Sequence, residues 1–256
     1  MIAQEYENKS LHNGTIIDWK IVAVRIIFSL IGVGLIAVGA SIRVGAGVIC
    51  VAALGVMLFL GWPRLVKIPH SNMARFGISV FLLIALGVAN WGTVHQMVFV
   101  VALSIMLSFG AEMFRRDGRP YMTEQASATF VADLLCMAAS MWLFVWKQPN
   151  GHSLTFLFAV VIAVAAIVES IETRISHILA LMNALIAGFL MAWLLSLPIE
   201  VGLLSGMCVS IAYVAVIRAR KNALNPTKAM LGEGSRAIIP HCILGAVAYI
   251  FALLFV

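Results

Sequence analysis

A series of long apolar runs constrains the fold of this chain more than any other feature. The runs lie at 20–40, 44–62, 75–91, 94–113, 124–146, 153–170, 175–195, 199–217 and 237–256, and charged or turn-forming residues separate them. A helix in lipid satisfies its own backbone hydrogen bonds and needs about 20 apolar residues to cross the hydrocarbon core. The pattern therefore predicts an all-α integral membrane protein with a bundle of nine transmembrane helices, or eight if one of the weaker runs does not span.

Composition leaves little room for anything else. Hydrophobic residues make up 62% of the chain and charged residues 11%, whereas roughly a quarter of the residues of a soluble domain are charged. We expect a polar cytoplasmic tail at 1–18, no cleaved signal peptide, and a single transmembrane domain at 19–256. The net charge of +6 is dispersed among the connections, so the sequence gives no indication of nucleic-acid binding.

The distribution of basic residues predicts the orientation. If the amino terminus is cytoplasmic, only Arg43 and Lys147 of the 17 Lys and Arg residues fall in outer loops. Cytoplasmic loops of membrane proteins carry the excess of Lys and Arg. Nine spans then place the carboxy terminus outside, and the chain is expected in a bacterial plasma membrane. The basic inner segments, the longest at 218–236, are expected to lie against anionic lipid headgroups.

The connection "EMFRRDGRPYMTEQ" at 112–125 is the most charged of the shorter ones. Its arginines Arg115, Arg116 and Arg119 have two interpretations: they set topology at the inner face, or they bind a lipid phosphate or headgroup, since guanidinium groups bind phosphate bidentately. Signatures of membrane enzymes are absent, including the His-Glu-x-x-His zinc motif and a phosphate-binding glycine loop with lysine. We therefore predict no catalytic residue, no metal and no cofactor, and regard an enzyme as the less favoured alternative.

Asp133 is the most informative single residue. It lies about ten positions into the run 124–146, on the order of 15 Å from the helix end and close to the middle of the membrane. A charged side chain at that depth is costly and by default marks a functional site. Two interpretations stay open: an ion, proton or substrate path, or a neutral carboxyl group bonded to a neighbouring helix.

Four further residues are candidates for a polar pocket with Asp133, and they are Arg25, His177, Asn183 and His241. Taken singly, each has a structural explanation. Arg25 would extend toward the inner headgroups, His177 would cap a helix start, and His241 follows Pro240, which would open the last helix. Taken together, they predict a polar pocket open to the cytoplasm.

Small residues indicate where helices approach closely. Gly202 and Gly206 form a Gly-x-x-x-Gly pair, which favours close packing within the bundle or in a homo-oligomer or other membrane partner. Gly32, Gly34 and Gly39 suggest similar packing for the first span.

Two loop motifs carry a resemblance to a known group. "GWPRLVKIP" follows the second run, and "EMFRRDGRP" precedes a helix that begins with Ser and Thr. In these features, which span about residues 60–135, the chain resembles actinobacterial multi-pass membrane proteins that are labelled permease or uncharacterised. The resemblance implies a bacterial origin and transfers no substrate or site residue. Together, these observations favour a permease-like transporter of a small molecule or ion; an inner-face enzyme acting on a phosphorylated lipid and an assembly subunit of a membrane complex remain the alternatives.

Overall fold

The computed structural model describes residues 19–42, 44–66, 71–113, 122–171, 175–223 and 230–255, and these residues form helices and short connections without any strand. The helices are α2 (Trp19–Ser41), α3 (Val44–Leu65), α4 (Ser71–Trp91), α5 (Val94–Met113), α6 (Met122–Trp146), α7 (Gly151–Glu169), α8 (Ser176–Leu194), α9 (Ile199–Ala223) and α10 (Met230–Phe255). The predicted all-α class is therefore confirmed, and so is the prediction of nine helices for the described part of the chain.

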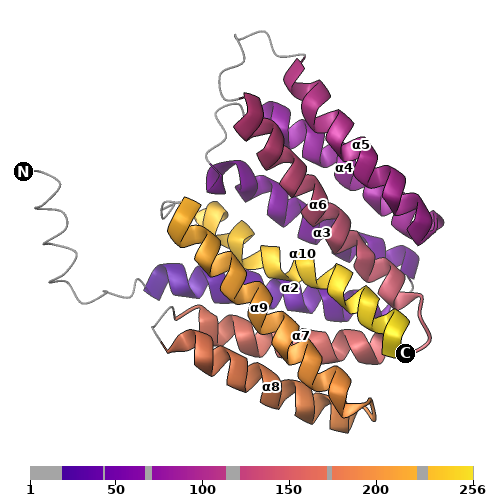
Figure 1. Cartoon of the computed structure of the whole chain (residues 1–256), viewed down its shortest axis with the longest axis vertical. Coiled ribbons are helices and arrows are strands. Elements are labelled where there is room, and N and C mark those ends of the chain that lie inside the picture. Colours follow the sequence, from indigo (N-terminus) through magenta and orange to yellow (C-terminus); the bar gives the residue numbers. More distant parts are fainter. Residues whose placement is uncertain are drawn as a thin grey trace, which may run out of the picture.

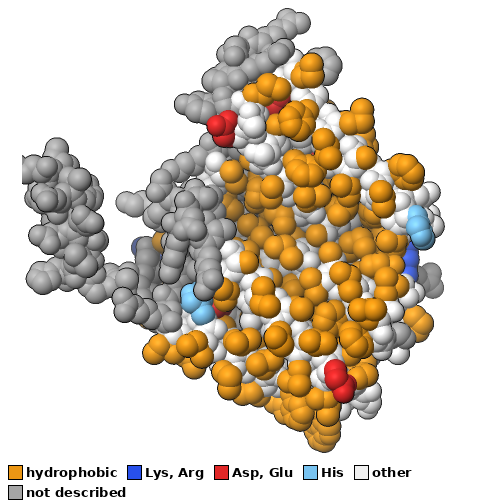
Figure 2. All heavy atoms as spheres, in the orientation of Figure 1, with side chains coloured by type: hydrophobic (Ala, Val, Ile, Leu, Met, Phe, Trp, Pro, Cys, Tyr) orange, Lys and Arg blue, Asp and Glu red, His pale blue; other side chains and the backbone are white. Residues whose placement is uncertain are grey.

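Length and apolarity support a multi-pass membrane protein. Eight of these helices are long and apolar enough to cross a bilayer, and the apolar stretch of α5, Val94–Gly110, is somewhat shorter. The face seen in Figure 2 is covered almost continuously by hydrophobic side chains, with charged groups only toward its margins. A surface of this kind is stable against lipid tails and unfavourable against water. The sidedness of the termini stays a prediction.

Helix α10 occupies the centre of the bundle. It packs against α3 and α6 on one side and against α2, α9 and α7 on the other (Figure 1). The pair α4 and α5 covers α6 and α3 at one edge, while α8 covers α7 and α9 at the opposite edge. Because neighbouring helices run in alternate directions, α2, α8 and α10 begin, and α7 and α9 end, at the same end of the bundle, on the left of Figure 1.

Small residues bring the central helices into contact. A Cβ atom on Gly61 of α3 would clash with the Leu231 carbonyl oxygen of α10, so only glycine permits this approach. Ser235 of α10 donates to the carbonyl oxygen of Met57 at 2.7 Å. This hydrogen bond gives the otherwise apolar contact between α3 and α10 a fixed register.

The Gly-x-x-x-Gly pair of α9 faces α8 of the same chain. Cβ atoms on Gly202 and Gly206 would clash with the carbonyl oxygens of Gly188 and Ala184. The glycines thus serve packing within the bundle, and an oligomer or membrane partner remains a prediction. In α2, Gly32 and Gly39 are likewise buried against α10 and α6, whereas a Cβ atom on Gly34 would meet no neighbouring helix within 4 Å.

The two helix boundaries that flank one connection differ from the sequence prediction, and the start of α10 positions the site. The segment 218–236 was expected to be a basic connector, but α9 continues to Ala223 and α10 begins at Met230. The prediction ended the connector at the last charged residue because isolated charges avoid lipid. Glu233 and Arg236 instead lie in the first turns of α10, where the fold provides them with partners of opposite charge.

Candidate functional site

A cluster of buried charges lies where α2 and α10 begin. Glu233 Oε2 accepts a hydrogen bond from Arg25 Nε at 2.7 Å and another from Arg236 Nη1 at 3.4 Å. All three residues are at most 7% exposed. Glu233 and Arg236 are three residues apart on one helix, a spacing that places side chains on the same face. One carboxylate therefore bridges two guanidinium groups across two helices.

The position of Arg25 corrects one expectation. Its guanidinium group was expected to extend toward the headgroups, but it is buried and held by Glu233. A long side chain reaches toward water when no buried partner compensates its charge. Here α10 presents a carboxylate to α2, so the arginine is retained within the bundle.

A second ionisable pair joins α7 to α8 at the same end of the bundle. Both carboxylate oxygens of Glu169, the last residue of α7, lie 3.0 Å from Nδ1 of His177 in the first turn of α8. The Glu169 side chain is 1% exposed and that of His177 is 29% exposed. His177 was expected to cap the helix start, but the cap position belongs to Ile175, and the imidazole instead partners Glu169.

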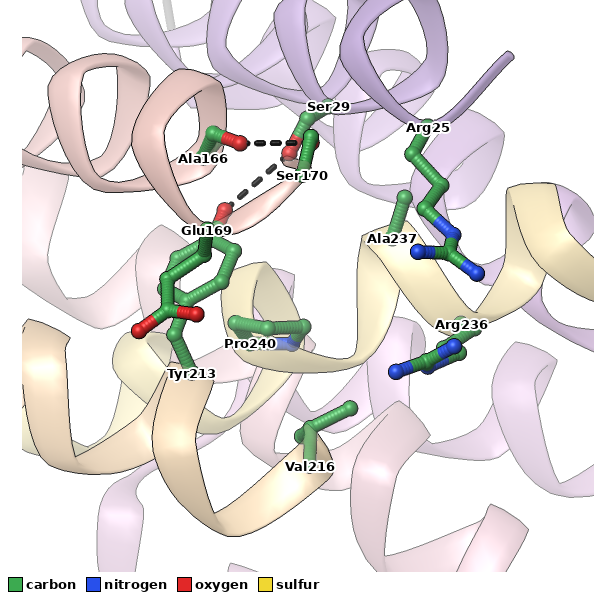
Figure 3. Close-up of a pocket in the computed structure, with 10 residues that line it drawn as sticks. All are labelled: Arg25, Ser29, Ala166, Glu169, Ser170, Tyr213, Val216, Arg236, Ala237 and Pro240. Carbon is green, nitrogen blue, oxygen red and sulfur yellow. Dashed lines mark hydrogen bonds between the residues drawn. The ribbon is translucent and has the colours of Figure 1, made fainter. Parts of the chain in front are cut away.

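Three of these charged residues, Arg25, Glu169 and Arg236, line a cavity of about 30 Å³ (Figure 3). Its polar lining comes from Arg25 and Ser29 of α2, Glu169 at the end of α7, the adjoining Ser170, Tyr213 of α9 and Arg236 of α10. We call it the charged cavity. A space of this size holds one or two water molecules when several polar groups line it.

The two sides of the charged cavity differ in character. Figure 3 shows Glu169 and Tyr213 on one side and the two arginines on the other, with Ala237 and Pro240 between them. The hydroxyl groups of Tyr213 and Ser29 are 3.0 Å apart and hydrogen-bonded, and either can donate. The residues that line the cavity therefore carry a carboxylate, two guanidinium groups and three hydroxyl groups.

His241 supports this region without lining the cavity. Its Nε2 donates to the carbonyl oxygen of Ser29 at 3.0 Å, and its own carbonyl oxygen accepts from Trp142 Nε1 at 3.0 Å. Pro240 was expected to open the last helix, but it lies inside α10. Proline has no N–H group and interrupts the helical ladder, and here the interruption falls at the cavity wall.

Asp133 occupies a different part of the molecule. It is 1% exposed on α6, and its Oδ2 accepts from Ser108 Oγ of α5 at 3.2 Å. Its Oδ1 has no hydrogen-bond partner in the described ranges. Asp133 is not among the residues that line the charged cavity. The structure thus separates the Asp133 carboxyl group, in the middle part of α6, from the charged cluster near the bundle end.

The remaining sequence-predicted residues lie elsewhere. Asn183 is exposed on α8, and its Nδ2 donates to the Leu179 carbonyl oxygen of its own helix. Arg115, Arg116 and Arg119 fall outside the described residues. Of the five pocket candidates, the structure brings Arg25, His177 and His241 to the charged cavity or its immediate partners.

Three residues that partner these candidates were not predicted from the sequence. Glu169 ends α7, Glu233 lies in the first turn of α10, and Tyr213 lies inside α9. The sequence contained one indication of Glu233. Glu233 and Arg236 are three residues apart, so they lie on the same helix face if the last helix begins before the apolar run 237–256. A second indication was that the predicted topology places Glu169 and Arg25 toward the same, cytoplasmic side of the membrane.

Fold and site together define a multi-pass α-helical membrane protein with a buried charged cavity near one end of its bundle. Comparisons with protein-family models, with curated proteins and with solved structures find no match for this chain.

Proposed function

We propose that this protein is a permease-like transporter of a small molecule or ion, and that the charged cavity is part of its path. The observation that carries the proposal is the set of ionisable groups that line this cavity, Arg25, Glu169 and Arg236, inside a bundle of apolar helices. Ionisable residues within spans commonly mark the paths of ions, protons or substrates.

The geometry of the cavity favours small polar species. About 30 Å³ holds one or two water molecules or a small ion, so a larger solute requires the helices to move apart. Pro240 lines the cavity inside the continuous helix α10, where proline removes one hydrogen bond of the helical ladder. Movement of α10 at this point would enlarge the cavity toward one side of the membrane.

The proposal is tested by uptake into liposomes that contain the purified protein. The panel consists of labelled sodium, rubidium, phosphate, acetate, glutamate and lysine, with an internal pH dye for protons. We expect at least one of these species to enter faster than into protein-free liposomes. Arg236→Gln should lower that rate because it removes a charge from the cavity wall.

A matched control variant is available on the same chain. Arg64, in the last turn of α3, is exposed and does not line the charged cavity. Arg64→Gln should leave the uptake rate near that of the unmodified protein. If no species of the panel enters faster than into protein-free liposomes, the transport proposal is contradicted.

A further inference from the structure

We infer that His177 and Glu169 form a proton relay between the end of the bundle and the charged cavity. The inference rests on the proposed function, which it deepens by naming the proton as the coupling ion. The two side chains differ strongly in exposure, since that of His177 is 29% exposed and that of Glu169 is 1% exposed. Their contacting atoms lie 3.0 Å apart, within hydrogen-bond distance.

The position of Glu169 gives the relay its direction. Glu169 contacts His177 on α8 and also lines the charged cavity, whereas His177 is not a lining residue. Figure 3 shows the Glu169 carboxylate beside Tyr213, on the side of the cavity away from Arg25 and Arg236. A proton on His177 therefore reaches the cavity through the carboxylate of Glu169.

The steps conserve protons and charge. His177, whose side chain is 29% exposed, takes up a proton from solution at Nε2 and becomes an imidazolium ion. Its Nδ1 proton passes to a Glu169 oxygen, which leaves a neutral imidazole and a carboxylic acid. The acid then releases this proton to water in the charged cavity and returns to the carboxylate. The neutral imidazole now carries its proton on Nε2, and loss of that proton to solution with uptake of another at Nδ1 restores the starting tautomer.

The charged groups around Glu169 are arranged to favour this exchange. His177 faces it from α8 and Tyr213 from α9, while Arg25 of α2 and Arg236 of α10 lie across the charged cavity with Glu233 between them. Helix α6 also contacts α7, and its buried carboxyl group, that of Asp133, bonds to Ser108 of α5. Glu233 bridges the two arginines, and His177 is the basic side chain in direct contact with Glu169.

The hydroxyl pair beyond Glu169 extends the route into the bundle. The Tyr213 and Ser29 hydroxyl groups, 3.0 Å apart, both line the charged cavity. A hydroxyl group donates and accepts a hydrogen bond at once, so this pair can pass a proton on from water in the cavity. Ser29 belongs to α2, and the route therefore leads from the α7–α8 edge toward the middle of the bundle.

The test follows protonation and needs no solute to move. Protein in lipid membranes is exposed to a sudden fall in pH while the infrared carbonyl band of protonated carboxylic acids is recorded. In the unmodified protein the band should rise, and Glu169→Gln should remove the part that belongs to Glu169. His177→Gln should keep the final amplitude but slow the rise by about tenfold or more, because a positioned proton donor has been removed.

Two controls keep the outcome interpretable. Asp133→Asn should remove at most the part of the infrared band that belongs to Asp133. It should leave the amplitude and the rate of the Glu169 part unchanged. His152 lies exposed in the first turn of α7, at the opposite end of that helix from Glu169, and His152→Gln should leave amplitude and rate unchanged. His177 is partly exposed, so its variant remains informative even if Glu169→Gln fails to fold.

The inference is overturned if Glu169→Gln leaves the whole band intact or if His177→Gln leaves its rate unchanged. Failure of the transport proposal has a different signature. If the infrared results are as expected but no species of the uptake panel enters the liposomes, the relay stands and transport does not. If a species is transported while neither Glu169→Gln nor His177→Gln changes the infrared band, the transport proposal is supported and the relay is contradicted.

Discussion

Two regions of this bundle bury carboxyl groups, and they provide these groups with different hydrogen-bond partners. In the contact between α5 and α6, Asp133 receives one hydrogen bond, from the neutral hydroxyl of Ser108, and its Oδ1 has no partner in the described ranges. In the charged cavity and its surroundings, Glu233 receives hydrogen bonds from two guanidinium groups, and Glu169 contacts an imidazole. One region offers its carboxyl group a single neutral donor, and the other contains a network that spans five helices.

The difference teaches that a position near the middle of a helix does not by itself bring a buried carboxyl group together with other polar groups. Asp133 lies nearer the middle of its helix, and among the described residues a single hydroxyl group, that of Ser108, donates a hydrogen bond to it. The groups around the charged cavity lie nearer the helix ends, and they combine opposite charges with a space for water. Asp133 has one hydroxyl donor and does not line the charged cavity, whereas the groups of that cavity adjoin a space that holds water.

The largest effect is expected from Glu233→Gln. The substitution removes the negative charge that two buried guanidinium groups share, and breaking a buried ion pair costs about 3–5 kcal/mol in the free energy of unfolding. Denaturation of the purified protein measures the loss. Glu200 is the matched control, because it lies in the first turn of α9 but is exposed, and Glu200→Gln should change stability little. Equal effects of the two variants would show that the network does not stabilise the fold.

A smaller effect is expected in the other region. Asp133→Leu leaves the Ser108 hydroxyl without its acceptor and should lower the free energy of unfolding by about 1–3 kcal/mol. Asp133→Asn keeps a carbonyl oxygen in the same place and should be nearly neutral. The two variants are compared by the same denaturation measurement. If Asn is as destabilising as Leu, the charge of Asp133 matters, and the contrast between the two regions fails.

The smallest effect is expected from Tyr213→Phe. This substitution removes one hydrogen bond to Ser29 and preserves the aromatic ring, so the expected loss is about 0.5–1.5 kcal/mol. The relay predicts in addition a slower proton exchange, which the infrared measurement reports. Tyr249 of α10 is the control, since it is also buried but does not line the charged cavity. If Tyr213→Phe leaves the rate of proton exchange unchanged, the proton route does not continue beyond Glu169 to the hydroxyl pair.

Much of the fold could be predicted from the sequence because lipid imposes a simple rule. Each span must be apolar over its whole length, so the runs indicate the helices, and most boundaries lie within a few residues of those observed. The exceptions are the end of α9 at Ala223 and the start of α10 at Met230, because the charged residues in these turns have the composition of a connection. Sequence alone does not show that Arg25 of α2 compensates Glu233, because the two residues are 208 positions apart.

The candidate site was predictable only in part for the same reason. Asp133, Arg25 and His241 stand out within apolar runs, and a rule on charges in membranes finds them. Glu169, Tyr213 and Ser170 become informative only when α7 and α9 are placed beside α2. Which polar residues face one another is a property of helix packing, and no alternation or spacing within one helix encodes it.

The central claim, that transport runs through the charged cavity and not past Asp133, is tested most directly by comparing uptake in two variants. Ala237 lines the cavity, so Ala237→Leu fills it while every charged group is kept. The account predicts that Ala237→Leu abolishes uptake of the transported species of the panel, whereas Asp133→Asn retains it. Both variants must first show near-unmodified melting temperatures, because added core volume can itself destabilise. Retained uptake in Ala237→Leu together with lost uptake in Asp133→Asn would contradict the account.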